Sequence, residues 1–341
     1  MKPLYVIYCI VFSFVLFGCE KEIMSLFIDF KRPSYFPQTV YRFQQNPVTK
    51  NGFELGRKLF FDPILSADNS ISCGSCHIPS SAFTQHGHSV SHGINDLLGK
   101  RNSPPIMNLA WSSSFMWDGG IVDLDLQPIA PITSHVEMGE SMDNVLKKLQ
   151  NSTEYRSLFA SAFSGAEITN ANMLKALSQY MLMCVSAESK YDSVMRKEAT
   201  FSPVQAEGYL IFIDKCNVCH SEPLFTDNSF RNNGLPPKRL NDEGRKTVTL
   251  RDEDQYKFKV PSLRNLQYTV PYMHDGRFYS LDAVLDHYAS KIIDAPTLDT
   301  ELARNGQFGI PLTPSEREQL LAFLETLNDR TFVTNPSIAE P

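Results

Sequence analysis

Apolar side chains recur at helical spacing in several stretches of the chain, and this pattern predicts a mainly α protein. In residues 52–61 the spacing places Phe53, Leu59 and Phe60 on one face. Asp62-Pro63 should end this helix, because the residue before a proline disfavours the helical backbone. Similar spacing predicts helices over residues 141–160, 169–197, 203–215 and 281–288, and a last helix that includes residues 320–327.

Two of these helices begin with capping sequences. Ser202-Pro203-Val204-Gln205 and Thr313-Pro314-Ser315-Glu316 each place a hydroxyl residue before a proline and a Glu or Gln three positions further on, which satisfies free N–H groups of the first helical turn. Residues 78–135 and 221–260 are polar and lack a regular period, so we expect long loops there. Loops of this length in a compact domain usually serve function. No stretch has the pattern of a parallel sheet.

The N-terminal segment has the composition of an export signal. Lys2 precedes an apolar run over residues 4–17 that is too short to span a membrane comfortably. Gly18-Cys19 follows, in a context that resembles a bacterial lipobox, so we interpret residues 1–18 as a lipoprotein signal peptide and Cys19 as the lipidated first residue of the mature chain. A plain signal peptide and an uncleaved anchor are the alternatives.

Four of the seven cysteines lie in two C-x-x-C-H motifs. In this pattern two thiols bind one haem covalently, and the adjacent histidine ligates its iron. A zinc site of four thiolates is an alternative, but the two pairs are far apart in sequence and zinc does not need the histidines. A disulfide within each pair is a second alternative. We therefore predict two covalent haem c groups, bound by Cys73, Cys76 and His77 and by Cys216, Cys219 and His220.

The length of 341 residues is typical of two domains, and the order of elements suggests a duplication. A helix, a C-x-x-C-H motif and a long loop follow one another in residues 51–198 and again in residues 199–330. Residues 19–50 should form a tether and a surface-lying leader, and residues 331–341 a frayed tail. The net charge of −6 argues against a nucleic-acid partner. Cys184 is expected to be a buried, small hydrophobic residue.

The sixth position of each iron decides what a haem can do. Two strong protein ligands favour electron transfer, whereas an open or displaceable position admits peroxide or oxygen. Three histidines follow the first motif in a loop rich in Gly and Ser, and each of them either reaches the iron or is an ordinary surface residue. They are His86, His88 and His92.

Three further side chains after this loop are candidates for the first haem. Glu137 and Gln127 would suit peroxide cleavage beside an open iron, because a carboxylate can move a proton while an amide positions the two oxygens. Solvated loop residues are the alternative interpretation of both. Trp117 is either part of the site or part of the core.

The chain resembles the bacterial di-haem cytochrome c peroxidases and the related MauG-type enzymes. The resemblance extends over roughly residues 50–330, nearly the whole mature chain. Its stretches occur in the order of the family and together are highly specific. They are residues 55–63, the first haem motif, 99–104, 115–119, 131–139, the second haem motif, 260–265 and 271–276.

This resemblance implies two cytochrome c-like domains in a mainly α fold, each with one covalent haem. His77 would be the proximal ligand of the peroxidatic haem, and Trp117 would lie between the two haems. Gln127 and Glu137 match the distal pair. His92 matches the distal ligand that is released when the second haem is reduced. MauG-type enzymes lack that ligand, so His92 points to a peroxidase that is activated by reduction.

At the second haem the chain departs from the peroxidases. They carry an axial Met at the position occupied here by Tyr288, whereas a Tyr there is similar to the MauG type. A phenolate stabilises ferric iron and should lower the reduction potential. Met273 is an alternative sixth ligand, and His274 and His287 are further candidates.

The resemblance implies an exported, periplasmic enzyme that reduces hydrogen peroxide to water with electrons from a small cytochrome c or cupredoxin. A MauG-like oxidase of a protein or organic substrate and a non-enzymatic electron-transfer cytochrome are the alternatives. The only membrane contact would be a lipid anchor on Cys19, and a homodimer is the expected assembly. Calcium would be held at the domain junction by oxygens of Asn102, Thr269 and Pro271.

Overall fold

The computed structural model describes residues 29–165, 167–238, 241–304 and 306–341. This part of the chain is mainly helical, as predicted, and its few strands form two small antiparallel sheets, β1 with β2 and β3 with β4. The α-helices are α1 (Lys50–Phe61), α2 (Cys73–Cys76), α3 (Ile129–Thr133), α4 (Met142–Asn151), α5 (Thr153–Ala162), α6 (Asn170–Leu182), α7 (Lys190–Met195), α8 (Pro203–Lys215), α9 (Lys246–Thr249), α10 (Leu281–Ser290), α11 (Pro314–Glu325) and α12 (Arg330–Val333). The strands are β1 (Phe230–Arg231), β2 (Phe258–Lys259), β3 (Ala303–Arg304) and β4 (Gln307–Phe308).

Short 3-10 helices interrupt the long loops. They are η1 (Pro63–Leu65), η2 (Pro79–Ser81), η3 (Ile94–Asp96), η4 (Leu109–Trp111), η5 (Leu124–Leu126), η6 (Asp252–Asp254) and η7 (Thr300–Leu302). The predicted signal peptide and Cys19 lie outside the described residues. No helix within the described ranges is long and apolar enough to cross a membrane.

Four predicted helices are confirmed with their boundaries close to those expected. α1 ends at Phe61; the next residue, Asp62, caps the following η1 with its side chain, and α10 covers the predicted residues 281–288. Both capping sequences form capping boxes: Ser202 with Gln205 begins α8, and Thr313 with Glu316 begins α11. Local sequence chemistry therefore determines where these helices begin.

Two predicted helices are each divided into two. Residues 141–160 form α4 and α5, because the Ser152 side chain accepts a hydrogen bond from the Tyr155 N–H and starts a new helix. Residues 169–197 form α6 and α7, separated by a buried extended segment. There the Asn108 side chain donates to the Ser186 carbonyl at 3.0 Å and accepts from the Ser186 N–H at 2.9 Å. These bonds replace the helical ones that the sequence pattern predicted.

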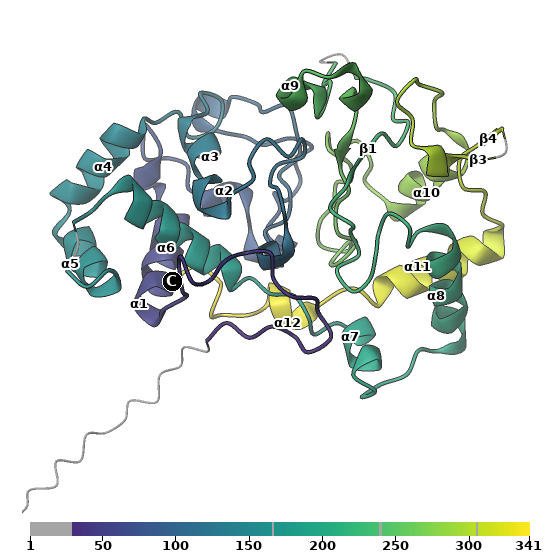
Figure 1. The fold of residues 1–341 in the computed structure, drawn as a ribbon, viewed down its shortest axis with the longest axis horizontal. Helices are drawn as coiled ribbons and strands as arrows, with labels where there is room; N and C mark the ends of the chain where they lie inside the picture. The colour runs from purple at the N-terminus through teal and green to yellow at the C-terminus, as the bar shows by residue number, and fades with distance from the viewer. Residues whose placement is uncertain (1–28, 166, 239–240, 305) are drawn as a thin grey trace, which may run out of the picture.

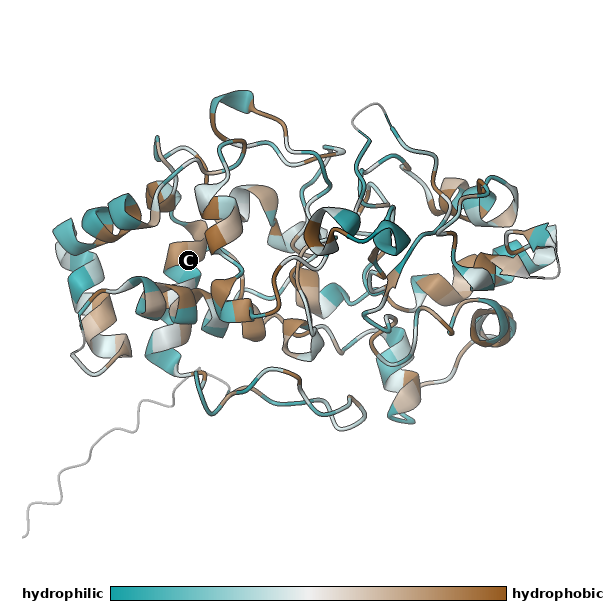
Figure 2. Cartoon of the chain, turned by 45° about the horizontal axis from the view of Figure 1, so that its top comes forward, coloured by the Kyte–Doolittle hydropathy of each residue, from teal (hydrophilic) through white to brown (hydrophobic). Residues whose placement is uncertain are grey.

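The buried apolar residues form two separate clusters. The first is built mainly on α1 and α6 and the second on α8 and α11, and Figure 1 shows these two helix pairs on opposite sides of the molecule. In the first half α1 packs against α6, and in the second α8 packs against α11. A glycine makes each contact close: a Cβ at Gly56 would lie 1.9 Å from the Ala176 carbonyl oxygen, and one at Gly208 would lie 1.9 Å from that of Gln319. The helices carry both hydrophobic and hydrophilic residues, as expected of helices with one buried face (Figure 2).

Both ends of the described chain pack on the first cluster. Phe36 of the leader is buried there. The prediction of a frayed C-terminal tail was wrong, because Phe332, Val333 and Ile338 are buried in the same cluster. In addition, the Tyr180 hydroxyl donates to the Ile338 carbonyl at 2.6 Å.

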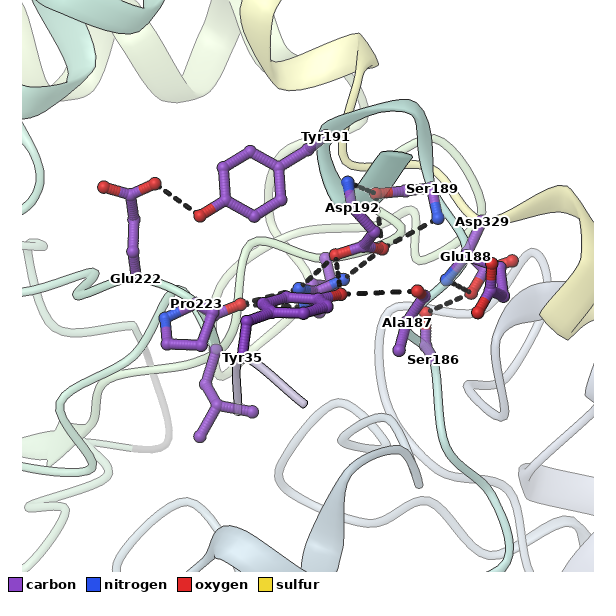
Figure 3. Close-up of polar contacts among 12 residues, drawn as sticks. Tyr35, Ser186, Ala187, Glu188, Ser189, Tyr191, Asp192, Glu222, Pro223 and Asp329 are labelled. Carbon is purple, nitrogen blue, oxygen red and sulfur yellow. Dashed lines mark hydrogen bonds and ion pairs between the residues drawn. The ribbon is translucent and has the colours of Figure 1, made fainter. Parts of the chain in front are cut away.

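A buried ion pair joins segments that are distant in sequence (Figure 3). Arg264 has no exposed side-chain surface, and its guanidinium donates to the two oxygens of Asp192 at 2.9 and 2.8 Å. It also donates to the Pro223 carbonyl, and the Tyr35 hydroxyl of the leader donates to Asp192 at 2.6 Å. The ion pair of Arg264 and Asp192 thus joins three segments by hydrogen bonds: the leader, α7 and the loop before β1.

Candidate active site

The first C-x-x-C-H motif presents its histidine in a form ready to bind iron. Cys73 and Cys76 lie in α2, and His77 follows directly. The His77 Nδ1 lies 2.7 Å from the Phe83 carbonyl oxygen, which can only accept, so Nδ1 carries the proton and Nε2 keeps its lone pair. Burial lowers the pKa of His77, which favours the neutral imidazole.

The second motif repeats this arrangement. The His220 Nδ1 lies 3.1 Å from the Pro261 carbonyl oxygen and 3.3 Å from that of Phe225, so its Nε2 is also left free. Burial lowers the pKa of His220 as well. The donor set at each motif, two thiols and one neutral imidazole, is the one that covalent haem requires.

The structure gives no support to the zinc and disulfide alternatives. Cys73, Cys76, Cys184 and Cys216 are free thiols, so neither motif contains a disulfide. Within the same residues, His, Cys, Asp and Glu side chains nowhere form a group of three or more that could hold a metal ion. Cys184 is fully buried, as predicted.

A cavity of about 590 Å³ lies beside the first motif and brings together the candidate residues of the first haem. It is lined by the two cysteines and the histidine of that motif and, among others, by His92, Trp117, Gln127, Glu137 and Lys259. His86 and His88 are exposed and do not line it, although the rings of His88 and His92 are 4.1 Å apart. Of these three histidines, only His92 lines the cavity, and it is the fold that makes this distinction.

Glu137 has the environment of a proton-transfer group. It is half-buried, and burial raises the pKa of its carboxyl, while hydrogen bonds from Ser91 and Ser134 lower that pKa in part. The Ser91 hydroxyl donates to Oε1 at 3.4 Å. Gln127 lines the same cavity, with its Nε2 3.7 Å from the Met116 sulfur. A carboxyl with a raised pKa and an amide in the wall of one cavity match the chemistry expected of a peroxide site.

Trp117 connects this cavity to the second half of the chain. Its indole N–H donates to the Asn102 carbonyl at 2.8 Å. Its ring lies 6.4 Å from that of His274, edge to face, and His274 stacks on Phe258 at 3.7 Å. An aromatic contact path therefore leads from the cavity wall into the second half.

Lys259 is a cavity residue that the sequence interpretation missed. Its ammonium donates to the Ser114 carbonyl at 2.7 Å, and burial, with no carboxylate to oppose it, lowers its pKa to about 8. The side-chain oxygen of Asn228, in the same wall, is buried and has no hydrogen-bond partner among the described residues. A buried cation without a counter-charge is costly, so the cavity suits a ligand with carboxylates, such as the propionates of haem. The sequence carried one signal for Lys259: it stands between two apolar residues, Phe258 and Val260, and both of these are buried in the structure.

Of the four candidate sixth ligands at the second motif, two are engaged elsewhere. His287 is 1% exposed and its Nε2 lies 3.0 Å from the Asn233 carbonyl, whereas His274 is stacked as described above. Tyr288 lies near both thiols of the motif: burial raises the pKa of its phenol, a hydrogen bond from Asn233 lowers that pKa in part, and the charges of Cys219 and Cys216 raise it. Met273 and Tyr288 share a contact with the Asn233 side chain, at 3.6 and 3.5 Å.

The three residues of the predicted calcium site come from two loops. The Asn102 N–H donates to the His274 carbonyl at 2.7 Å, which joins its loop to the one containing Thr269 and Pro271. The Asn102 carbonyl already accepts the Trp117 N–H. Calcium at this place stays a prediction.

Comparison with known proteins places the chain in a family. A profile described as "Di-haem cytochrome c peroxidase" matches residues 50–200. The methylamine utilization protein MauG of Methylorubrum extorquens is 38% identical over 319 residues, 90% of this chain and 86% of that protein. The cytochrome c551 peroxidase of Pseudomonas aeruginosa is 31% identical over 306 residues, 86% of this chain and 83% of that protein.

A solved structure shows the same fold. The crystal structure of a MauG-like protein associated with microbial copper homeostasis has a TM-score of 0.83 and 30% identity to this chain, and covers 92% of this chain and 99% of its own. Relatives named MauG and relatives named cytochrome c peroxidase thus align with most of its length. The chain belongs to the family of di-haem cytochrome c peroxidases and MauG proteins, whose members carry two haem c groups.

Proposed function

We propose that this chain is a di-haem peroxidase that reduces hydrogen peroxide to water. The observation that carries the proposal is the common cavity, in which Glu137, Gln127 and His92 lie with the first C-x-x-C-H motif. When bound, the haem groups supply the redox chemistry of the reaction. In this proposal residues 51–198 hold the peroxidatic haem and residues 199–330 the haem that receives electrons.

Three side chains would do the protein's part of the chemistry. The Glu137 carboxylate would take a proton from one peroxide oxygen and return it to the other, which would leave as water when the bound haem groups supply two electrons. The Gln127 amide orients the two oxygens. Trp117, which lines the cavity and has its ring 6.4 Å from that of His274, would pass electrons from the second half into the cavity.

His92 provides the sharpest test of this proposal. We expect the oxidised protein to be low-spin at both irons, and a high-spin ferric signal to appear only after one electron is added, because His92 then leaves the iron. His92→Ala should show the high-spin signal already in the fully oxidised state. Optical and electron-spin-resonance spectra of the haem-loaded protein before and after half-reduction measure both.

His88→Ala is the matched control, since His88 touches His92 but does not line the cavity, and it should stay low-spin. A high-spin signal in the oxidised native protein would show that His92 is not a ligand and would favour the MauG-like activity. Two irons that stay low-spin throughout would indicate an electron-transfer cytochrome.

Lys259 should stabilise the haem-loaded protein through a propionate. Lys259→Met keeps the length of the side chain and removes its charge, and a hydrogen bond to a charged group contributes roughly 1.5–3 kcal/mol. We expect the free energy of unfolding of the haem-loaded protein to fall by about this amount in urea titrations. Lys147→Met on the exposed side of α4 is the control. Equal stability of the two variants would contradict this role.

A MauG-like oxidase is the second candidate, because Tyr288 lies near the thiols of the second motif. A phenolate on the second iron would stabilise its ferric state and store oxidising charge for a protein or organic substrate at the surface. This function predicts poor turnover of reduced cytochrome in the steady-state peroxidase assay.

The remaining parts of the proposal concern location and partners. Export to the periplasm with a lipid on Cys19 would place the enzyme where covalent haem attachment occurs in bacteria. A small cytochrome c or cupredoxin would donate the electrons, and a homodimer would be the working assembly. Calcium on Asn102, Thr269 and Pro271 would hold the two loops beside Trp117 together.

A further inference from the structure

The loop after β1 brings one amide to both candidate ligands of the second iron. The Asn233 Nδ2 lies 3.5 Å from the Tyr288 hydroxyl and 3.6 Å from the Met273 sulfur. Among the described residues, Asn233 is the only hydrogen-bond partner of that hydroxyl. An amide N–H can only donate, so the Tyr288 oxygen receives a hydrogen bond and gives none to it.

The backbone holds Asn233 in place independently of its side chain. The His287 Nε2 donates to the Asn233 carbonyl at 3.0 Å, which ties the loop to α10 one residue before Tyr288. On the next residue, the Gly234 N–H donates to the Asn232 side chain at 2.9 Å and the Gly234 carbonyl accepts from Ile293 at 3.0 Å. The amide is therefore aimed by a preorganised loop, as expected of a group that orients or tunes a ligand.

We propose that Asn233 is a positioning residue that sets the strength of Tyr288 as sixth ligand of the second haem. A donor on the phenolate oxygen stabilises its negative charge, so the oxygen gives less electron density to ferric iron. The same amide donates to the Met273 sulfur, so this thioether accepts a hydrogen bond from the side chain that also contacts Tyr288. This inference rests on the proposed ligation of the second iron by Tyr288. A phenolate alone would lower the reduction potential of the second haem, and the hydrogen bond from Asn233 would raise it again in part.

The test is the reduction potential of the second haem in the haem-loaded, full-length protein. Asn233→Leu keeps the volume and removes the donor, and Asn233→Asp keeps the shape and offers only acceptors at pH 7. In both variants the phenolate becomes a stronger donor, so the equilibrium constant for reduction should fall about tenfold, which is 59 mV for one electron. The phenolate-to-iron absorption should shift in the same samples. Asn51→Leu, the same change on the exposed surface of α1, is the control and should leave the potential unchanged.

Two further variants separate this inference from the proposed ligation. Tyr288→Phe should abolish the phenolate absorption, and Met273→Leu should leave it in place. If Tyr288→Phe alters nothing while Met273→Leu changes the spectrum, the ligation itself is wrong and the inference fails with it. If Tyr288→Phe acts as expected but both Asn233 variants keep the potential and spectrum of Asn51→Leu, only the role of Asn233 is overturned. A potential that rises in the Asn233 variants would overturn it as well.

Discussion

Glu137→Gln should reduce peroxide turnover by roughly 10²–10⁴-fold, the usual contribution of a positioned proton-transfer group. The amide keeps the size of the side chain but cannot take a proton, whereas the cavity wall and both haem motifs stay in place. We therefore expect nearly unchanged haem spectra alongside the lost activity. Steady-state oxidation of a reduced small cytochrome by hydrogen peroxide measures the effect.

The pH profile should identify Glu137 as the group responsible. Burial raises the pKa of this carboxyl, and the proton acceptor must be ionised, so kcat/KM should fall as the pH drops through a value above the ordinary glutamate range. This acid limb should be absent from the residual activity of Glu137→Gln. Glu154→Gln on the exposed surface of α5 is the matched control. Full activity of Glu137→Gln would leave the peroxidase mechanism without its proton carrier.

Arg264→Leu should lower the free energy of unfolding by about 3–5 kcal/mol, because it leaves the carboxylate of Asp192 buried without a counter-charge. The variant also loses the bonds from the guanidinium to the Pro223 carbonyl. The midpoint of urea unfolding, followed by circular dichroism of the haem-loaded protein, measures the loss. Lys291→Met, which removes a partner of the exposed pair with Asp286, should change stability by less than about 1 kcal/mol.

The sign of the pH dependence separates this explanation from a simple packing defect. Burial alone would raise the pKa of Asp192, but the hydrogen bonds and charge of Arg264 outweigh burial and lower it. The pair's contribution is therefore present above the ordinary aspartate pKa and is lost as the pH falls through the lowered, folded-state value. Without Arg264 the pKa of Asp192 should rise. The difference in the free energy of unfolding between the native protein and Arg264→Leu should therefore become smaller as the pH falls. If this difference in the free energy of unfolding did not change with pH, the loss of stability would come from a packing defect instead.

The sequence predicted those features that depend on neighbours along the chain. The C-x-x-C-H motifs and the capping boxes of α8 and α11 are local patterns, and each determines its structure within a few residues. The breaks after α4 and α6 were missed. At Ser152 a weak local signal was overlooked, but the segment around Ser186 is extended because Asn108, 78 positions away, binds its backbone.

The residues of the candidate site also fall into two groups, those that local motifs or the family resemblance indicated and those that depend on distant partners. Motif spacing and family resemblance brought His92, Gln127 and Glu137 forward, but nothing local distinguishes His92 from His86 and His88. Lys259 was missed because its partner, the Ser114 carbonyl, is 145 positions away. Asn233 was missed for a similar reason, since Tyr288 lies 55 positions further on. Only the folded chain shows that Lys259 lines the cavity and that Asn233 contacts Tyr288.

The packing of the C-terminal tail has a consequence for biosynthesis. Arg57 of α1 donates to the Ala339 carbonyl, 282 positions later, and Ile338 is buried in the first hydrophobic cluster. The ribosome makes the chain from its N-terminus, so this cluster gains its last residues only after the second haem motif has been synthesised. The first hydrophobic cluster is therefore complete only when the whole chain has been made.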